Sequence, residues 1–441
     1  MKKQLWLPAA VLVMLLAGCG AQGAEPADAA PVTEATTAAV STQAVTACTT
    51  QTTTETTATS AETSATQTTT TEPVQQKITL KTAGAVEVYD TVLLRDYITE
   101  PEIRLENRNS RLDTSKTGTV EQSVRFTYQG QSYTQNIRYQ VVDTTPPLLL
   151  NGGYNTVIET EKPFDLNKCV GFGDNYDKSP RLTYTGQVDT AVPGKYPITA
   201  TVTDAAGNKT SWDLTVTVAD KLPTYTDTAS RLSFSDFAEA YGGKNKRLGI
   251  DVSKWQGKIN FEAVRDAGCQ FVIMRIGHGR NGMEMDEYYR SNMAGAKAAG
   301  LDVGVYFYST ANTEKAVRQE ARWIAENLKG EKLDFPVVFD WESFSNFQKY
   351  GMSIHDLNML FEAFADELQK QGYSAMLYGS KNYLQNFWYP QKKYPVWLAH
   401  YTDQTDYLGD YAIWQMSCRG RIPGIAGDVD LDIQYMDVHL E

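Results

Sequence analysis

The chain has 441 residues, too many for one ordinary domain, and 42% of them are hydrophobic, which is enough for real cores. Its net charge of -12 at pH 7, with no basic cluster beyond the N-terminus, argues against a nucleic-acid partner. Four histidines without ligand-like spacing and five cysteines without a C-x-x-C pair predict no zinc site and no histidine-based metal centre. Cys269 and Cys418 could pair, but we expect buried free thiols.

The N-terminus has the features of a targeting segment. Lys2 and Lys3 precede an apolar run, Leu5 to Ala17, that is too short to span a bilayer comfortably. The run ends in Leu16-Ala17-Gly18-Cys19, which resembles a bacterial lipobox. The resemblance implies a signal peptide at 1–18 and diacylglycerol on the Cys19 thiol. The protein would then be extracytoplasmic, lipid-anchored to the bacterial cell membrane and facing the cell wall. An ordinary secretory signal with an incidental cysteine is the alternative.

Residues 19–76 are dominated by Thr, Ala, Ser and Glu. Such a composition cannot form a packed core, so we expect a disordered linker. A flexible tether of this length has a root-mean-square span of roughly 40 Å. The linker would therefore lift the remainder of the chain off the membrane.

Short alternating strands separated by turn residues run from Ile78 to about Asp220. Leu112-Asp113-Thr114 with Gly118 recurs as Val188-Asp189-Thr190 with Gly194, an internal repeat with a period of about 76 residues. We therefore predict two all-β sandwiches of the immunoglobulin type, at residues 77–143 and 144–221.

The second copy also resembles bacterial immunoglobulin-like repeats. The resemblance lies in Asp143-Thr144-Thr145-Pro146-Pro147 and in the turn Asp204-Ala205-Ala206-Gly207-Asn208. Asp174, Asn175 and Asp177 could hold calcium, but a solvated turn is the favoured interpretation. Because neither copy shows converging acids, a metal cluster or histidine, we expect this region to act as a spacer, with wall binding as the weaker alternative.

Residues 222–246 form a connector with one short helix near Phe234 to Tyr241. Residues 247–441 then alternate strand-like and helical runs, which predicts an irregular (β/α) barrel of eight strands and about five helices. The helices include Asp286 to Ala299, Glu314 to Leu328 and His355 to Gln371. The strands are Leu248 to Val252, Phe271 to Ile276, Val303 to Tyr308, Pro336 to Trp341, Ala375 to Tyr378, Val396 to Ala399, Ala412 to Gln415 and Val429 to Tyr435.

The fourth of these strands ends in two acids, Asp340 and Glu342. Residues two apart in a strand project to the same face, roughly 6.6 Å apart along the axis, while Trp341 projects to the other face. Two carboxyl groups at such a short distance cannot both ionise easily, so one of them tends to keep its proton. A protonated and an ionised carboxyl together are the equipment of glycoside hydrolysis.

A barrel of this kind carries its chemistry at the C-terminal ends of its strands. Acids and aromatic residues gather at those ends: Asp251 lies at the end of the first strand, and Asp430 lies on the eighth. Asp430 could instead make a hydrogen bond within the barrel, and Trp255 or Trp397 could serve packing only. The aromatic candidates for contact with a sugar are Tyr306, Tyr308, Trp341, Tyr378, Trp397, Tyr401 and Trp414.

These strand-end motifs together resemble glycoside hydrolase family 25, the lysozymes or N-acetylmuramidases of bacteria and phages. The resemblance covers nearly all of 247–441 and departs mainly at Ile276-Gly277-His278-Gly279 and at Asp432, where the family often has Asn. The motifs are Gly249-Ile250-Asp251-Val252-Ser253, Trp255-Gln256-Gly257, Gly304-Val305-Tyr306-Phe307-Tyr308, Asp340-Trp341-Glu342, Trp397-Leu398-Ala399-His400-Tyr401, Trp414-Gln415 and Val429-Asp430-Leu431.

The resemblance implies hydrolysis of the β-1,4 bond between N-acetylmuramic acid and N-acetylglucosamine in peptidoglycan glycan strands, without a metal or other cofactor. Glu342 would be the general acid, and Asp251, Asp340 and Asp430 the other acids of the site. Asp340 or Asp251 would stabilise the positive charge of the transition state, and the family favours retention of configuration. A covalent aspartyl sugar and a substrate-assisted route both remain open.

Two other functions are compatible with a barrel at residues 247–441. A non-catalytic wall-binding or adhesion lipoprotein would be marked by loss of Glu342 or Asp251, and both are present. A different glycosidase, such as a chitinase, would usually show a longer run of spaced acids before the catalytic Glu, which this sequence lacks.

Overall fold

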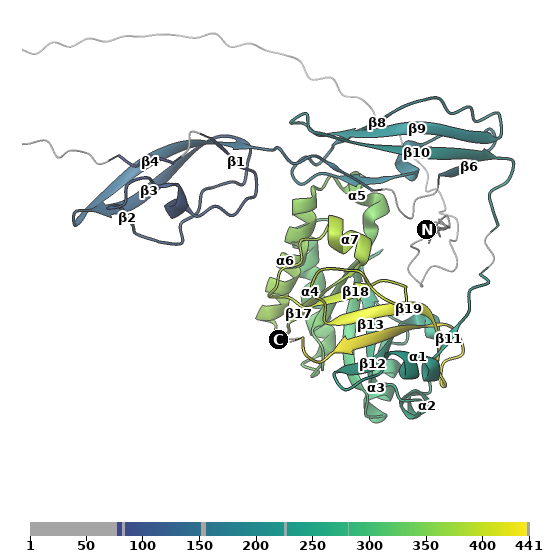
Figure 1. Cartoon of the computed structure of the whole chain (residues 1–441). Helices are drawn as coiled ribbons and strands as arrows, with labels where there is room; N and C mark the ends of the chain where they lie inside the picture. The colour runs from purple at the N-terminus through teal and green to yellow at the C-terminus, as the bar shows by residue number, and fades with distance from the viewer. Residues whose placement is uncertain (1–76, 82–83, 151–155, 225–226, 281, 439–441) are drawn as a thin grey trace, which may run out of the picture.

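The computed structural model describes residues 77–438 apart from 82–83, 151–155, 225–226 and 281, and shows three modules in chain order (Figure 1). The expected signal peptide, the lipid attachment at Cys19 and the linker at 19–76 lie outside these residues. No helix in the described part of the chain is both long and apolar enough to cross a membrane.

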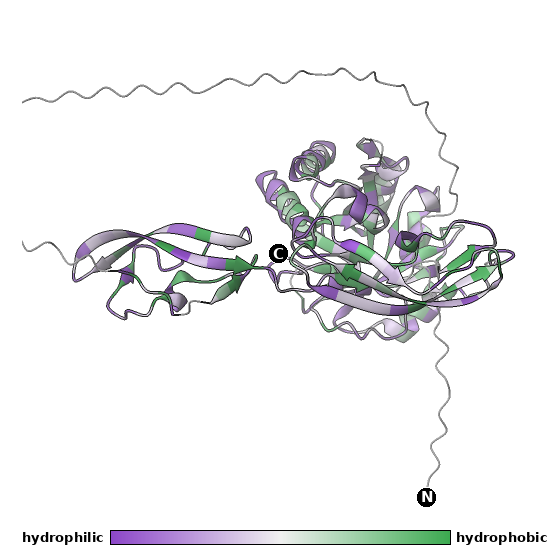
Figure 2. Ribbon diagram, turned by 90° about the horizontal axis from the view of Figure 1, so that it is seen from above, coloured by the Kyte–Doolittle hydropathy of each residue, from purple (hydrophilic) through white to green (hydrophobic). Residues whose placement is uncertain are grey.

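The first module is built on one four-stranded sheet in the order β1-β4-β3-β2. Residues along β3 and β4 alternate in hydropathy (Figure 2), and the apolar side chains, Phe126 among them, form a core with Leu94 of the 3-10 helix η1. The expected sandwich is therefore wrong for this copy, because loops rather than a second sheet cover the core in the described residues. The elements are β1 Ala85–Glu87, η1 Leu94–Tyr97, β2 Arg104–Leu105, β3 Gly118–Tyr128 and β4 Gln131–Val142.

The second module repeats this arrangement and adds a small sheet. Its four-stranded sheet has the order β6-β10-β9-β8, and β6 runs parallel to β10 just as β1 runs parallel to β4. The repeat found in the sequence is thus confirmed, since β3 and β9 begin at its two glycines, Gly118 and Gly194. The elements are β5 Leu148–Leu150, β6 Val157–Glu159, η2 Leu166–Lys168, β7 Gly171–Gly173, β8 Arg181–Thr185, β9 Gly194–Thr203 and β10 Lys209–Ala219, with β5 paired to β7.

The third module is a closed barrel of eight strands, which confirms all eight strands expected from the sequence. Its last strand departs from a regular (β/α) barrel, because β20 runs antiparallel to both of its neighbours, β12 and β19. This reversal brings the start of β20 to the same mouth as the C-terminal ends of the other strands. The barrel strands are β12 Lys246–Val252, β13 Phe271–His278, β15 Asp302–Ser309, β16 Val337–Trp341, β17 Ala375–Ser380, β18 Val396–Ala399, β19 Ile413–Arg421 and β20 Val429–Tyr435, with β11 Leu232–Ser233 and β14 Glu284–Met285 beside them.

Helices cover the barrel, and side chains cap their starts. Thr313 caps α4 and Ser353 forms a capping box with Asp356 at the start of α6, which fixes where each of these helices begins. The helices are α1 Phe234–Tyr241, α2 Phe261–Asp266, α3 Tyr289–Ala298, α4 Glu314–Leu328, α5 Phe347–Tyr350, α6 Ile354–Lys370 and α7 Lys381–Asn386, with the 3-10 turns η3 Lys254–Gln256 and η4 Ser343–Asn346.

The end of the expected connector belongs to the barrel. β11 pairs with β19, and the expected helix is found as α1, whose Phe234 and Phe237 are fully buried in the barrel core. Residues 232–246 are therefore part of the third module rather than of a free linker, because these two rings need the barrel to leave water.

The second module is docked on the barrel next to α5 and α6. The amide of Ile354 donates to the Asp174 carbonyl at 2.7 Å, and the Gln348 side chain donates to the Phe172 carbonyl at 2.8 Å. Leu150 of β5 lies in the same apolar cluster as Phe347 and Ile354, the cluster between the barrel strands and the helices around them. The spacer expectation is therefore wrong in one respect, since this module shares a packed interface with the barrel.

Gly173 offers a test of that interface. A Cβ atom at Gly173 would lie 2.9 Å from the Phe347 ring and 3.1 Å from the Phe387 ring. We expect Gly173→Val to lower the free energy of unfolding by about 1–3 kcal/mol and to increase the radius of gyration, because the overpacked contact must open. Chemical denaturation and small-angle X-ray scattering measure both effects, and Gly243→Val, at a site with open space, is the control. Wild-type values for Gly173→Val would refute tight docking.

Candidate active site

A pocket opens at the mouth of the barrel, where the chain brings together acids from three strands. Asp251 ends β12, Asp340 and Glu342 lie at the end of β16, and Asp430 lies at the start of β20 opposite Asp251. All four acids predicted from the sequence line this pocket. The convergence depends on the reversed direction of β20, which the strand pattern alone did not predict.

Asp340 and Glu342 form a carboxyl pair in hydrogen-bonding contact, as their spacing in the strand predicts. Asp340 is 6% exposed, and its Oδ1 has no donor from the rest of the protein. Burial raises the pKa of both groups, and the charge of Glu342 raises the pKa of Asp340 further. The pair therefore retains a proton at a pH where isolated carboxyls have lost theirs.

A hydrogen-bond network holds Asp251 in place. The Gln415 side chain donates to Asp251 Oδ2 at 2.7 Å, and Gln415 Oε1 accepts hydrogen bonds from the hydroxyls of Tyr378 at 2.9 Å and Tyr401 at 3.1 Å. Burial raises the pKa of Asp251 to about 7, the hydrogen bond from Gln415 opposes the shift, and the Glu342 charge adds to it. Gln415 thus orients Asp251 and favours its charged form.

Asp432, the residue that departs from the family pattern, lies behind Asp251. It is fully buried; its Oδ1 accepts a hydrogen bond from Trp397 Nε1 at 2.9 Å, and its carboxyl meets that of Asp251. Burial, together with the charges of Asp251 and Asp430, raises the pKa of Asp432 well above its ordinary range. A neutral Asp432 can donate to Asp251 just as an asparagine amide would.

This geometry makes Asp432→Asn a mild substitution. We expect its kcat/KM to stay within about 3-fold of wild type, because Asn keeps the acceptor for Trp397 and a donor for Asp251. Asp432→Leu, which lacks both groups, should lose more than about 10-fold, a cost typical of a supporting polar contact. Kinetic assays on the two variants give the comparison, and a large loss in Asp432→Asn would mean that Asp432 acts as an anion.

Five of the seven predicted aromatic residues line the pocket, namely Tyr306, Tyr308, Tyr378, Trp397 and Tyr401. Trp341 and Trp414 lie outside it, and neither fits a role in substrate contact. The Trp341 ring is 1% exposed and its Nε1 donates to the Ala311 carbonyl, while Trp414 Nε1 donates to the His400 carbonyl. Trp341 occupies the face of β16 opposite to the acids, so its ring packs in the core.

The structure adds residues that the predicted site did not include. Trp255 lines the pocket with 47% of its surface exposed, and Lys254 lies over its ring at 5.0 Å. Arg275 and Arg280 bring positive charge, and Arg275 Nε donates to Asp286 Oδ2 at 2.8 Å. A charged residue inside the apolar run of β13 was the available signal for Arg275.

A closed barrel whose mouth holds a proton-sharing carboxyl pair among tyrosine and tryptophan rings is the arrangement of a glycoside hydrolase. Residues 250–425 match the model of glycosyl hydrolases family 25, and residues 148–218 match that of the bacterial surface protein immunoglobulin-like domain. The third module is thus similar to the glycosyl hydrolases of family 25, and the second is similar to the bacterial surface immunoglobulin-like domain.

Two curated relatives are lysozymes by name. The chain is 31% identical to the autolytic lysozyme of Clostridium acetobutylicum over 186 residues, which cover 42% of this chain and 54% of the relative. It is 30% identical to lysozyme M1 of Streptomyces globisporus over 195 residues, covering 41% and 65%. The chain thus spans between about half and two thirds of these relatives. A solved bacterial lysozyme from Streptomyces coelicolor matches at 24% identity with a TM-score of 0.36, covering 42% of this chain and 90% of that one.

Proposed function

We propose that this protein is a peptidoglycan hydrolase of the muramidase type. It would cleave the β-1,4 bond between N-acetylmuramic acid and N-acetylglucosamine in the glycan strands of the bacterial cell wall. The observation that carries the proposal is the pair of buried Asp340 and half-buried Glu342 at the mouth of an aromatic-lined pocket. The names of the two curated relatives support the choice of substrate.

In this proposal Glu342 donates the shared proton to the glycosidic oxygen as the bond breaks. Both carboxylates of the pair are then charged, at the moment when positive charge develops on the sugar ring. Their repulsion, which raises the pKa of the pair in the free protein, is offset by that charge. Asp251, which accepts a hydrogen bond from Gln415, is a further carboxylate that would stabilise this positive charge.

Proton donation by a carboxyl group with a raised pKa also fixes the direction of the pH dependence. The pair must hold its proton for the reaction, so activity should persist above the ordinary titration range of a glutamate and fall as the pH rises further.

The exposed ring of Trp255 beside the acids suits the apolar face of a pyranose.

The test is incubation of the whole protein with purified peptidoglycan, followed by identification of the new reducing ends. A muramidase leaves reducing N-acetylmuramic acid, whereas cleavage of the other glycan bond leaves reducing N-acetylglucosamine. Absence of new reducing ends together with retained binding would favour a non-catalytic wall-binding protein instead.

We also propose that Cys19 carries lipid and anchors the protein to the outer side of the cell membrane, facing the wall. The support is the sequence Leu16-Ala17-Gly18-Cys19 behind a short apolar run. The expected result is that wild type partitions with membranes, whereas Cys19→Ser is released or left unprocessed. Fractionation with mass spectrometry of the N-terminal peptide measures this, and unacylated wild type found wholly in the medium would refute it.

A further inference from the structure

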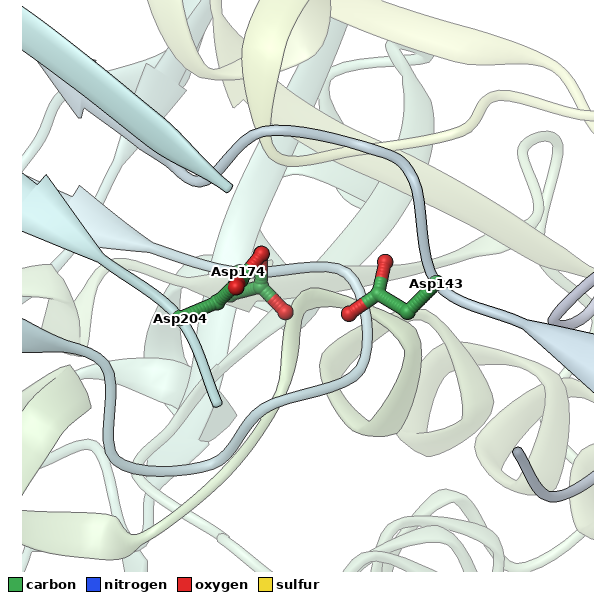
Figure 3. A group of neighbouring side chains, drawn as sticks. All are labelled: Asp143, Asp174 and Asp204. Atoms are coloured by element: carbon green, nitrogen blue, oxygen red, sulfur yellow. The ribbon is translucent and has the colours of Figure 1, made fainter. Parts of the chain in front are cut away.

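Three aspartates from separate strand ends meet where the first and second modules join. Asp143 follows β4 of the first module, Asp174 follows β7, and Asp204 follows β9 of the second module. One carboxylate oxygen from each lies within 4.8 Å of the others. Figure 3 shows the carboxylates of Asp174 and Asp204 directed toward that of Asp143.

These carboxylates are buried, and some of their oxygens have no donor. Asp174 is 0%, Asp204 6% and Asp143 8% exposed, so the expectation of a solvated turn is wrong for Asp174, whereas Asn175 and Asp177 are half-buried. Asp174 Oδ2 and Asp143 Oδ1 are buried without a hydrogen-bond partner, as is the Oδ1 of the neighbouring Asn175. A buried oxygen left without a partner is costly, so this set of three atoms requires an explanation.

The surrounding backbone holds the acids in position while leaving those oxygens free. Asp174 Oδ1 accepts from the amides of Tyr176 at 2.9 Å and Asp177 at 2.6 Å. The Asn208 amide and side chain donate to the two oxygens of Asp204, both at 2.8 Å, and the Asn208 side chain also donates to the Asp143 carbonyl at 3.0 Å. The cluster is therefore pre-oriented rather than a chance gathering of acids.

No cationic side chain neutralises the cluster in the described part of the chain. None of the three aspartates forms an ion pair there, and Lys178, next in sequence to Asp177, pairs with Asp356 at 2.9 Å instead. Burial, with the charges of the other two aspartates, raises the pKa of Asp143 to about 6, and burial raises the pKa of Asp174 as well. Three like charges this close need either protons or a cation.

We propose that Asp143, Asp174 and Asp204 bind one calcium ion. Carboxylate and amide oxygens are hard ligands, which suit calcium or magnesium rather than zinc or copper. Calcium accepts six to eight oxygens in irregular geometry, whereas magnesium demands a near-ideal octahedron and keeps its water. Asp177, the third candidate from the sequence, is not among the acids whose oxygens lie within 4.8 Å of one another, which are Asp143, Asp174 and Asp204.

The ion would fix the relative orientation of all three modules. Asp143 ends the first module, Asp204 belongs to the second, and the backbone of Asp174 accepts a hydrogen bond from Ile354 of the barrel. The Tyr89 ring of the first module also stacks on His355 of the barrel, with centroids 3.5 Å apart. This proposal is independent of the proposed hydrolase activity, since none of its residues lines the catalytic pocket.

The test is titration of the whole chelator-treated protein with calcium chloride, followed by calorimetry and thermal unfolding. We expect one saturable site with a Kd of about 10⁻⁴ to 10⁻³ M, the range of extracellular calcium modules. The Tm should rise with calcium concentration, because the ion binds only the folded state. Scattering should show a narrower distribution of shapes once calcium is bound.

The variant Asp174→Asn separates a calcium site from simple charge repulsion. With a calcium site, this variant weakens binding at least 10-fold and loses the calcium-dependent rise in Tm. Asp213→Asn, at an exposed position in the same module where the Thr199 hydroxyl donates to the side chain, should respond to calcium like wild type.

Three results would overturn the proposal. One is the absence of any saturable heat or Tm response in wild type at 10 mM calcium chloride, a concentration well above the expected Kd. The second is a full calcium response in Asp174→Asn. The third is an equal response of wild type to magnesium at the same concentrations, which would refute the assignment of the ion.

Discussion

The variant Glu342→Gln is expected to lose about 10²- to 10⁴-fold in kcat on peptidoglycan, the usual contribution of a positioned general acid. Glutamine keeps the size of the side chain and its contact with Asp340, but it has no proton to give to the leaving oxygen. Binding of glycan fragments should survive, because the aromatic rings of the pocket are untouched. Release of reducing ends and a separate binding measurement would be compared with wild type.

The control for this variant is Glu326→Gln, the same exchange at an exposed position of α4. It should keep wild-type kcat, which would exclude a general effect of losing one negative charge. If Glu342→Gln released reducing ends at nearly the wild-type rate, Glu342 could not be the general acid.

Asp251→Asn is expected to lower the activity of the protein and to raise its stability. Its kcat/KM should fall by about 10²- to 10³-fold, as when one preorganised electrostatic partner of a transition state is removed. Its stability at pH 8 should rise by up to about 4 kcal/mol, since the Asp251 pKa of about 7 lies far above the ordinary value of 3.8.

The sign of the stability change follows from proton linkage. In wild type the unfolded chain loses the Asp251 proton near the ordinary pKa, while the folded protein keeps it until about pH 7. Stability therefore falls between these two values and reaches its full loss above pH 7. Asparagine does not titrate, so the gain should be small at pH 4 and largest at pH 8. A gain independent of pH would mean that burial of the charge is not its cause.

Much of the barrel could be predicted from the sequence because its strands are buried on both faces. Such strands are continuous apolar runs, so all eight can be located without knowing which strands pair. The antiparallel direction of β20 could not be found in this way, because apolar runs carry no information on direction. Asp430 was nevertheless identified from the Val429-Asp430-Leu431 motif of the family resemblance, although it lies near the start of its strand.

Two aromatic residues were wrongly predicted to contact substrate, because a side chain's role depends on which face of its strand it occupies. Trp414 resembles the other aromatic residues by position along its strand, yet it lies outside the pocket. Trp341 also lies outside it, as the alternation of side chains along its strand already indicated. The docking of the second module depends on Gly173 leaving space for Phe347, a contact between residues far apart in the chain. Local sequence patterns cannot detect such a contact. The cluster of three aspartates was not predicted for the same reason, because its members are also far apart in the chain.

The parallel pairing of β1 with β4, and of β6 with β10, has a mechanical consequence. In each small module the early strand and the last strand lie side by side and run in the same direction. Tension applied to the two ends of such a module pulls these neighbours past each other along their length. The hydrogen bonds between them then bear the load together instead of opening one after another. Each of these modules is therefore built to resist stretching along the line of the chain.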